Sequence, residues 1–245
     1  MAPLADTTVG AATSFRWWLP DLGGFWTALG AAWDSSIITL LGEHTHNFCW
    51  GGATAIRRET FEAVGIRAHW TRTVSDDWAM TNALRSTGRQ IHFVPECIVP
   101  TLRDTTLKGL LEFTNRQMII TRVYASNIWM AGAFAHLLYT ATFLVGVALI
   151  IQSFLQGGIW LPTLLLLFMV MLLAAAKGVL RWMAVCELLP VWKGKLVKYA
   201  WAWTMLMPFV PLLYALNFMV SAFTRRIVWR GMRYDLVSPT QTRIL

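Results

Sequence analysis

Charged residues are scarce in this chain of 245 residues: they make up 14% of it, whereas 56% of the residues are hydrophobic and the mean hydropathy is +0.49. A soluble globular domain is about a quarter charged, so the composition excludes an ordinary soluble domain. The hydrophobic content also excludes a disordered chain. Cysteine is scarce too: Cys49, Cys97 and Cys186 are far apart and form no Cys-x-x-Cys pair. This excludes a disulfide framework and a structural zinc site.

Acidic residues are nearly missing from the second half of the chain. Residues 1–124 hold eleven Lys and Arg against eleven Asp and Glu, whereas residues 125–245 hold ten against two. The excess positive charge lies beside long apolar runs. Basic residues in that position are typical of the cytoplasmic face of a membrane protein. The charge pattern therefore favours a membrane as partner and argues against nucleic acid.

Three runs of the chain, at residues 131–155, 156–176 and 199–223, contain no Asp, Glu, Lys or Arg. Each is long enough to cross a bilayer, which takes about 20 apolar residues. Pro208 and Pro211 interrupt the third run, so two to three spans are expected. The basic segment 177–198 is expected in the cytoplasm, and two crossings then place residues 1–125 there as well. A full third crossing would put the basic tail, residues 224–245, on the opposite side, against the same rule.

The first 125 residues have the pattern of an α/β domain. Ser75 is expected to cap a helix that starts at Asp76 and ends near Gly88, and residues 90–94 are expected to form a strand. Residues 106–124 carry an apolar stripe at helical spacing, which predicts a helix on the membrane surface. The Trp-rich segment 16–33 suits either a membrane interface or a protein core.

Two short motifs in this domain are candidates for chemistry. The adjacent carboxylates of Asp76 and Asp77 suit a general base or a metal ligand, although acidic residues also favour the first turn of any helix. Trp50, Gly51 and Gly52 form a turn in which the glycines allow close approach of a ligand. His44 and His46 lack a third ligand at metal-binding spacing.

A third set of candidates lies on the helix before the first apolar run. Arg116, Gln117, Arg122 and Tyr124 are placed there. Arginines at this position suit three roles: anchoring the helix, binding a lipid headgroup, or binding a diphosphate.

In order, the segments Trp50-Gly51-Gly52…Arg57-Arg58, Ser75-Asp76-Asp77-Trp78 and Arg116-Gln117…Tyr124, followed by membrane helices, resemble a known family. They are similar to the C-terminal portion of membrane-bound family 2-type (GT-A) glycosyltransferases, in the ceramide glucosyltransferase-like branch. The resemblance implies that Asp77, with Asp76 beside it, deprotonates the acceptor hydroxyl in an inverting displacement. It also implies that Trp50, Gly51 and Gly52 line the sugar and acceptor site, and that Arg116, Gln117, Arg122 and Tyr124 act near the diphosphate.

The chain departs from that family in two respects. In place of the family's Gln-x-x-Arg-Trp pattern, Gln117 is followed by Arg122 five residues on, and Tyr124 is the nearby aromatic residue. The larger departure concerns the metal. The family holds a divalent metal, Mg or Mn, through an Asp-x-Asp motif in a nucleotide-binding half, and no Asp-x-Asp occurs in this sequence. We therefore expect a fragment: a partial GT-A domain of α/β class followed by a helical transmembrane region. Such a chain is expected to bind nucleotide sugar poorly and to be inactive alone.

The resulting hypothesis is an integral membrane glycosyltransferase, on the cytoplasmic face of a bacterial inner membrane. It would move a sugar from a nucleotide donor such as a UDP-sugar to a ceramide-like lipid. Two alternatives stay open: a processive polysaccharide synthase, and a non-enzymatic homologue that binds a lipid or a partner.

Overall fold

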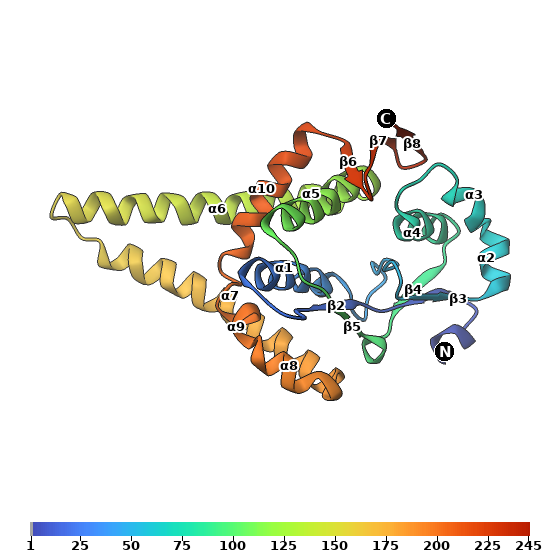
Figure 1. Ribbon diagram of the computed structural model, residues 1–245, viewed down its shortest axis with the longest axis horizontal. Coiled ribbons are helices and arrows are strands. Elements are labelled where there is room, and N and C mark those ends of the chain that lie inside the picture. Colours follow the sequence, from blue (N-terminus) through green and yellow to red (C-terminus); the bar gives the residue numbers. More distant parts are fainter. Residues whose placement is uncertain (1) are drawn as a thin grey trace.

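The computed structural model of the chain describes residues 2–245. Figure 1 shows a mixed α/β body from which two long helices project as a hairpin. The strands are β1 (Val9–Thr13), β2 (Arg16–Leu19), β3 (Thr54–Ile56), β4 (Gln90–Phe93), β5 (Val99–Leu102), β6 (Arg226–Trp229), β7 (Met232–Ser238) and β8 (Gln241–Ile244). The α-helices are α1 (Phe25–Ser35), α2 (Arg58–Val64), α3 (Ile66–Trp70), α4 (Asp76–Ser86), α5 (Leu107–Tyr124), α6 (Ser126–Leu155), α7 (Leu161–Leu188), α8 (Lys193–Lys198), α9 (Ala200–Thr204) and α10 (Val210–Phe223). Turns of 3-10 helix lie at Ala2–Ala5, Ile37–Leu40, Pro95–Cys97 and Pro190–Trp192.

Two pairs of parallel strands form the centre of the body, and in each pair a strand from the start of the chain lies beside one from residues 90–102. β1 pairs in parallel with β4 and antiparallel with β3, and β2 pairs in parallel with β5. The expected strand at residues 90–94 is thus confirmed as β4. The expected helix after Ser75 is confirmed as α4, since the Ser75 hydroxyl accepts a hydrogen bond from the Trp78 N–H. These strands position the candidate motifs, because the turn at residues 50–52 leads into β3 and the helix that begins at Asp76 leads into β4.

The Trp-rich segment serves mainly as core. Trp17, Trp18 and Trp33 are buried, and the Trp33 indole N–H donates to the Asn217 side chain over 3.1 Å. Trp26, in the first turn of α1, remains 39% exposed. Of the two sequence interpretations, core packing therefore holds for most of the segment.

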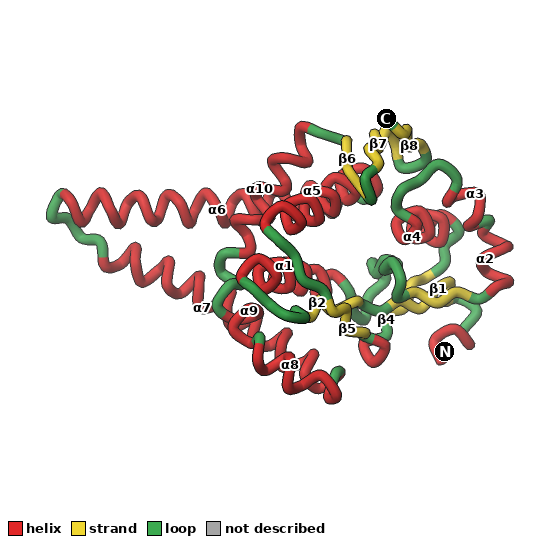
Figure 2. Tube along the Cα trace, viewed as in Figure 1, coloured by secondary structure: helices red, strands yellow, loops and turns green. Residues whose placement is uncertain are grey.

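The hairpin consists of α6 and α7, the two described helices that are long and apolar enough to cross a membrane. At 1.5 Å per residue, 30 and 28 residues measure about 45 and 42 Å, more than the roughly 30 Å of a bilayer core. Figure 2 shows that the hairpin is helical except for the loop at its tip. Few of its residues are covered by protein. The expected spans at 131–155 and 156–176 correspond to these helices, but Lys177 and Arg181 lie within α7 and not in a loop.

The run at residues 199–223, which the sequence leaves open as a third span, is not one continuous helix. The run is broken into α9 and α10 by a turn that contains Pro208. Because α10 has 14 residues, it measures about 21 Å and is too short to cross a bilayer core. It packs instead against α5 and α6, where the Asn217 amide donates to Thr114 and Asn115. With two helices of spanning length in place of three apolar runs, the position of the basic tail is compatible with the charge rule.

Two further expectations are refined by the packing. The apolar stripe of α5 faces protein, because Leu110, Met118 and Ile119 are buried and the helix packs against α1, α6 and α10. Residues 224–245 are not a simple tail, because they form the antiparallel sheet β6-β7-β8. This sheet contacts α5, and the Thr242 N–H donates to the Arg72 carbonyl over 2.8 Å.

Candidate functional site

A cavity of about 1250 Å³ runs from the loop before α4 to the apolar helices α6 and α7. At one end it is lined by Gly51, Asp76 and Asp77, and at the other by His136 of α6 and Ala174 of α7. Side chains of α1, α5 and α10 form the walls in between. The same space is therefore accessible to the candidate carboxylates and to a molecule held between the apolar helices.

The N-terminus of α4 holds the two carboxylates in different environments. The Asp77 carboxylate accepts hydrogen bonds from the Trp78 N–H over 2.8 Å, from the Gly51 N–H over 3.3 Å and from the Ser75 hydroxyl. The Asp76 side chain is exposed. Burial raises the pKa of Asp77 above its ordinary value; hydrogen bonds from Ser75 and Trp78 oppose this, and the charge of Asp76 adds to it. A fixed carboxylate with a raised pKa is a better proton acceptor near neutral pH than a free one.

The glycine turn is built to approach these carboxylates. The Trp50 N–H donates to the hydroxyls of Thr13 and Thr54, which ties the turn to β1 and β3. Gly52 has a φ of 77°, a conformation that glycine adopts readily. A Cβ on Gly51 would lie 3.3 Å from an Asp77 carboxylate oxygen, so a side chain there would crowd the carboxylate.

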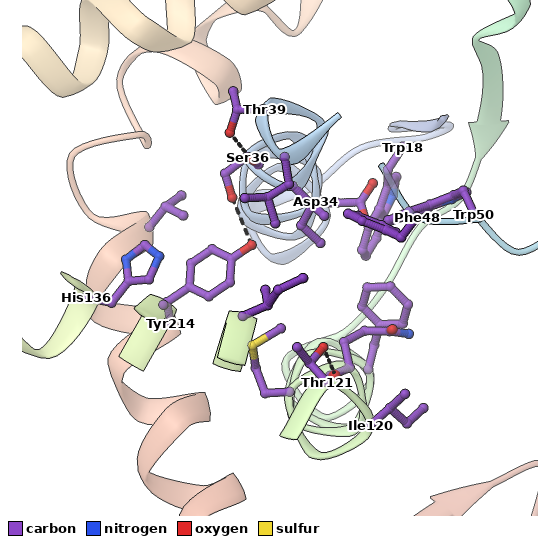
Figure 3. Close-up of a pocket in the computed structure, with 18 of the residues that line it drawn as sticks. Trp18, Asp34, Ser36, Thr39, Phe48, Trp50, Ile120, Thr121, His136 and Tyr214 are labelled. Carbon is purple, nitrogen blue, oxygen red and sulfur yellow. Dashed lines mark hydrogen bonds between the residues drawn. The ribbon is translucent and has the colours of Figure 1, made fainter. Parts of the chain in front are cut away.

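Aromatic rings and arginines line the cavity next to the carboxylates. Trp50 lies 4.4 Å from Phe15 between ring centroids, and Figure 3 shows Phe48, Trp50 and Trp18 along one wall. The Arg103 guanidinium lies over the rings of Trp18 and Phe113 at 4.5 and 4.4 Å. Arg16 and Arg116 line the same space. None of these three arginines forms an ion pair with an acidic side chain of the described chain. Flat apolar faces beside unpaired cations suit a sugar joined to phosphate groups.

The structure adds a cavity residue that no sequence motif singled out. Asp34, in the last turn of α1, lines the cavity and is 5% exposed. Burial raises its pKa to about 7, although the charges of Arg103 and Arg16 act in the opposite direction. The sequence held one signal: a lone acid in the apolar helix 25–35, at the C-terminal end, where the helix dipole disfavours negative charge.

The raised pKa of Asp34 predicts a pH-dependent cost in stability. In the folded state this carboxyl holds its proton up to about pH 7, whereas the unfolded chain releases it near pH 4. The free energy of unfolding therefore falls as pH rises through this window, by up to roughly 4 kcal/mol for a shift of three pKa units. Asp34→Asn should be more stable than the wild type at pH 8, and this gap should narrow at pH 5. Thermal unfolding in detergent across pH 4.5–8.5 measures it; parallel curves for the two proteins would contradict the burial of a titrating carboxyl.

Beyond Asp34 the cavity leads to the apolar helices α6 and α7. The hydroxyls of Ser36 and Tyr214 are 2.8 Å apart, and the Tyr214 ring stacks on His136 of α6 at 4.4 Å. Figure 3 shows this contact beside α1. A second cavity of about 390 Å³ lies between α6 and α7, and it shares Ala135 and Tyr139 with the first. Polar groups thus give way to an apolar space within the hairpin.

Most candidates from the sequence line this cavity, but two do not. Trp50, Gly51, Gly52, Asp76, Asp77, Arg116 and Gln117 are in its lining. Arg122 instead donates to the Ser221 carbonyl over 2.6 Å and so holds α5 against α10. The Tyr124 hydroxyl is buried and accepts from the Val74 N–H over 3.1 Å, which positions the loop before the carboxylates. Direct substrate contact by Arg122 and Tyr124 has no support in the cavity lining.

A divalent ion held by the protein would need a cluster of suitable ligands. Over residues 2–245, no group of three or more His, Cys, Asp or Glu side chains is arranged to hold a metal ion. Asp76 and Asp77 alone are too few for a Mg or Mn site of oxygen ligands. The residues present do not fit a protein-held ion, and no step is assigned to one.

Paired carboxylates, unpaired cations and aromatic faces around one cavity are the features of a group-transfer enzyme, here built onto two apolar helices. The chain belongs to glycosyl transferase family 21, whose family model matches residues 2–242. No curated protein and no solved structure matches it. Membership supports glycosyltransferase activity and implies a nucleotide-sugar donor and an acceptor. A match over nearly the whole chain gives no support to the description of a partial domain.

Proposed function

We propose that this protein transfers a sugar from a nucleotide-sugar donor, such as a UDP-sugar, to the hydroxyl of a ceramide-like lipid acceptor. The observation that carries the proposal is the single cavity that contains both Asp77 and side chains of α6 and α7. A soluble acceptor does not require such a connection. A lipid acceptor does, because its tails stay in the bilayer while its hydroxyl reaches the carboxylate.

The chemistry follows from the residues at the inner end. Asp77 takes the proton of the acceptor hydroxyl as the oxygen attacks the anomeric carbon, and the bond from that carbon to the diphosphate oxygen breaks. The nucleoside diphosphate leaves from the opposite face, so the anomeric configuration inverts. Arg16, Arg103 and Arg116 lie in the cavity without acidic partners and would stabilise the negative charge of the leaving group.

The helices α6 and α7 also determine the membrane topology that we propose. With α6 and α7 as the crossings, residues 2–125 and 189–245 lie on one side, and the basic residues after 188 favour the cytoplasmic side. We place the protein in a bacterial inner membrane with its catalytic part in the cytoplasm. Two crossings do not enclose a channel for a growing polymer, which favours a lipid acceptor over processive polysaccharide synthesis.

Narrowing the cavity within the hairpin should test the lipid path. Ala174 lines the cavity on α7, whereas Ala176, two residues further, is outside the lining. In Ala174→Phe we expect at least a tenfold loss of lipid glycosylation, because the ring occupies the space needed by the acceptor. Ala176→Phe, which adds the same bulk away from the cavity, should stay within about twofold of the wild type.

The assay uses the whole chain in nanodiscs with ceramide and radiolabelled UDP-glucose at millimolar concentration, since weak donor binding is expected from the sequence. Transfer is counted in the organic phase. Crosslinking of a ceramide with a photoreactive tail to α6 or α7 is measured in the same samples. Lipid crosslinking without any transfer at saturating donor would overturn the enzymatic proposal in favour of a lipid-binding homologue. Equal losses in both Phe variants would overturn the lipid path.

A further inference from the structure

Asp34 occupies the middle of the cavity, between the carboxylates and the membrane helices. It lies on α1 two residues before Ser36, which bonds Tyr214 on the membrane side. On the other side its neighbours are Trp18 and Arg103, and Figure 3 labels Asp34 between Ser36 and Trp18. Asp34 therefore lines the same space as a molecule that would extend from the hairpin to Asp77.

The chain satisfies little of the hydrogen-bonding capacity of Asp34. The Trp18 backbone N–H is a hydrogen-bonding neighbour, and no ion pair to Asp34 occurs among residues 2–245. Above about pH 7, where Asp34 is ionised, its carboxylate has about four acceptor positions. The side chain is 5% exposed and lines the cavity, so the remaining positions are open only to what the cavity holds. Burying such a group without partners is unfavourable, so the open positions face the cavity in need of donors.

The nearby arginines do not pair with the Asp34 carboxylate. Arg16 donates to the Thr101 hydroxyl over 3.2 Å, and Arg103 is held between the rings of Trp18 and Phe113. Both are near enough to interact with Asp34 through their charges, yet neither forms an ion pair with it. The space between cations and carboxylate is part of the cavity.

We propose that Asp34 determines acceptor specificity by accepting a hydrogen bond from a second donor group of the lipid, a hydroxyl or amide N–H near the hydroxyl that reacts. The inference rests on the proposed function. It assigns the acceptor to lipids with at least two neighbouring hydrogen-bond donors. A lipid whose reacting hydroxyl is its only donor leaves Asp34 unpaired when it displaces water, and it binds less tightly for that reason.

Two neutral two-tailed lipids separate these classes. Ceramide carries an amide N–H and a second hydroxyl beside its primary hydroxyl, whereas dioleoylglycerol carries a single hydroxyl and no other donor. Both compete with a tail-labelled photoreactive ceramide for the wild type, Asp34→Ala and Asp34→Asn in nanodiscs. Thr39→Ala is the matched control, because Thr39 also lines the cavity but its hydroxyl is already bonded to the Ser36 carbonyl over 2.7 Å.

We expect the wild type to prefer ceramide at least tenfold, and Asp34→Ala to bring the preference within about threefold. Asp34→Asn should restore part of it, since its amide oxygen still accepts a hydrogen bond, and Thr39→Ala should leave it unchanged. A preference that is unchanged in Asp34→Ala, or that falls equally in Thr39→Ala, would overturn the role of Asp34. If neither lipid displaces the probe from the wild type, the lipid-acceptor proposal itself fails, which is a distinct outcome.

Discussion

Asp77→Asn is expected to lower the rate of sugar transfer to lipid by about 10²–10⁴-fold, the usual contribution of a general base. The amide has the shape of the carboxylate but does not take up the proton of the acceptor hydroxyl. Because Asp77 is held by Ser75, Gly51 and Trp78 at the start of α4, the substitution removes basicity from a fixed position in the cavity. Transfer from radiolabelled UDP-glucose to ceramide at saturating donor measures the loss.

The neighbouring acid provides the comparison. The Asp76 side chain is exposed and is not held in this way, so Asp76→Asn should cost at most about tenfold. Elution from gel filtration and the near-ultraviolet circular dichroism of both variants should match the wild type. If Asp77→Asn keeps turnover within threefold of the wild type, Asp77 is not the base. A larger loss for Asp76→Asn than for Asp77→Asn would transfer the role to Asp76.

Gly178→Ala is expected to have the largest effect on folding. Gly178 is the buried point at which α7 meets α9, and a Cβ there would overlap with the backbone carbonyl oxygen of Trp203. Trp203 in turn donates to the Ala31 carbonyl of α1 over 3.3 Å and packs on Trp17 of β2. The hairpin and the α/β body therefore meet at a point that has no room for a methyl group. Overpacking of this kind costs about 1–3 kcal/mol or more.

For a chain of this size, that cost corresponds to a fall in melting temperature of roughly 2–12 °C. Gly194→Ala is the matched control, because Gly194 is exposed and a Cβ added there would meet nothing within 4 Å. That variant should melt at or slightly above the wild-type temperature, since Ala favours a helix over Gly. Fluorescence-detected melting in detergent compares the three proteins. A melting temperature of Gly178→Ala equal to that of Gly194→Ala would show that α7 and α9 are not in such close contact.

Local patterns were sufficient for several elements. The Ser75 cap, the strand after Gly88 and the apolar run 131–155 depend on neighbouring residues, and each corresponds to an observed element. The motif order also led to the correct class of enzyme, since the family match covers residues 2–242. The run 199–223 stayed open as a third span in the sequence, because apolar content alone does not distinguish a helix that contacts lipid from one that contacts protein. Asn217, buried against α5, shows that α10 belongs to the body.

The sequence by itself determined that this chain has long apolar runs, an excess of positive charge beside them, and a glycine turn followed by paired carboxylates. These are properties of composition and of short segments, for which local spacing is enough. Only the tertiary structure decided that Asp34, Arg16 and Arg103 share a cavity with Asp77, and that Arg122 and Tyr124 support the fold outside it. Those relations join residues about 20 to 100 positions apart. They depend on how β1, β2, α1 and α5 pack, and no local pattern contains that information.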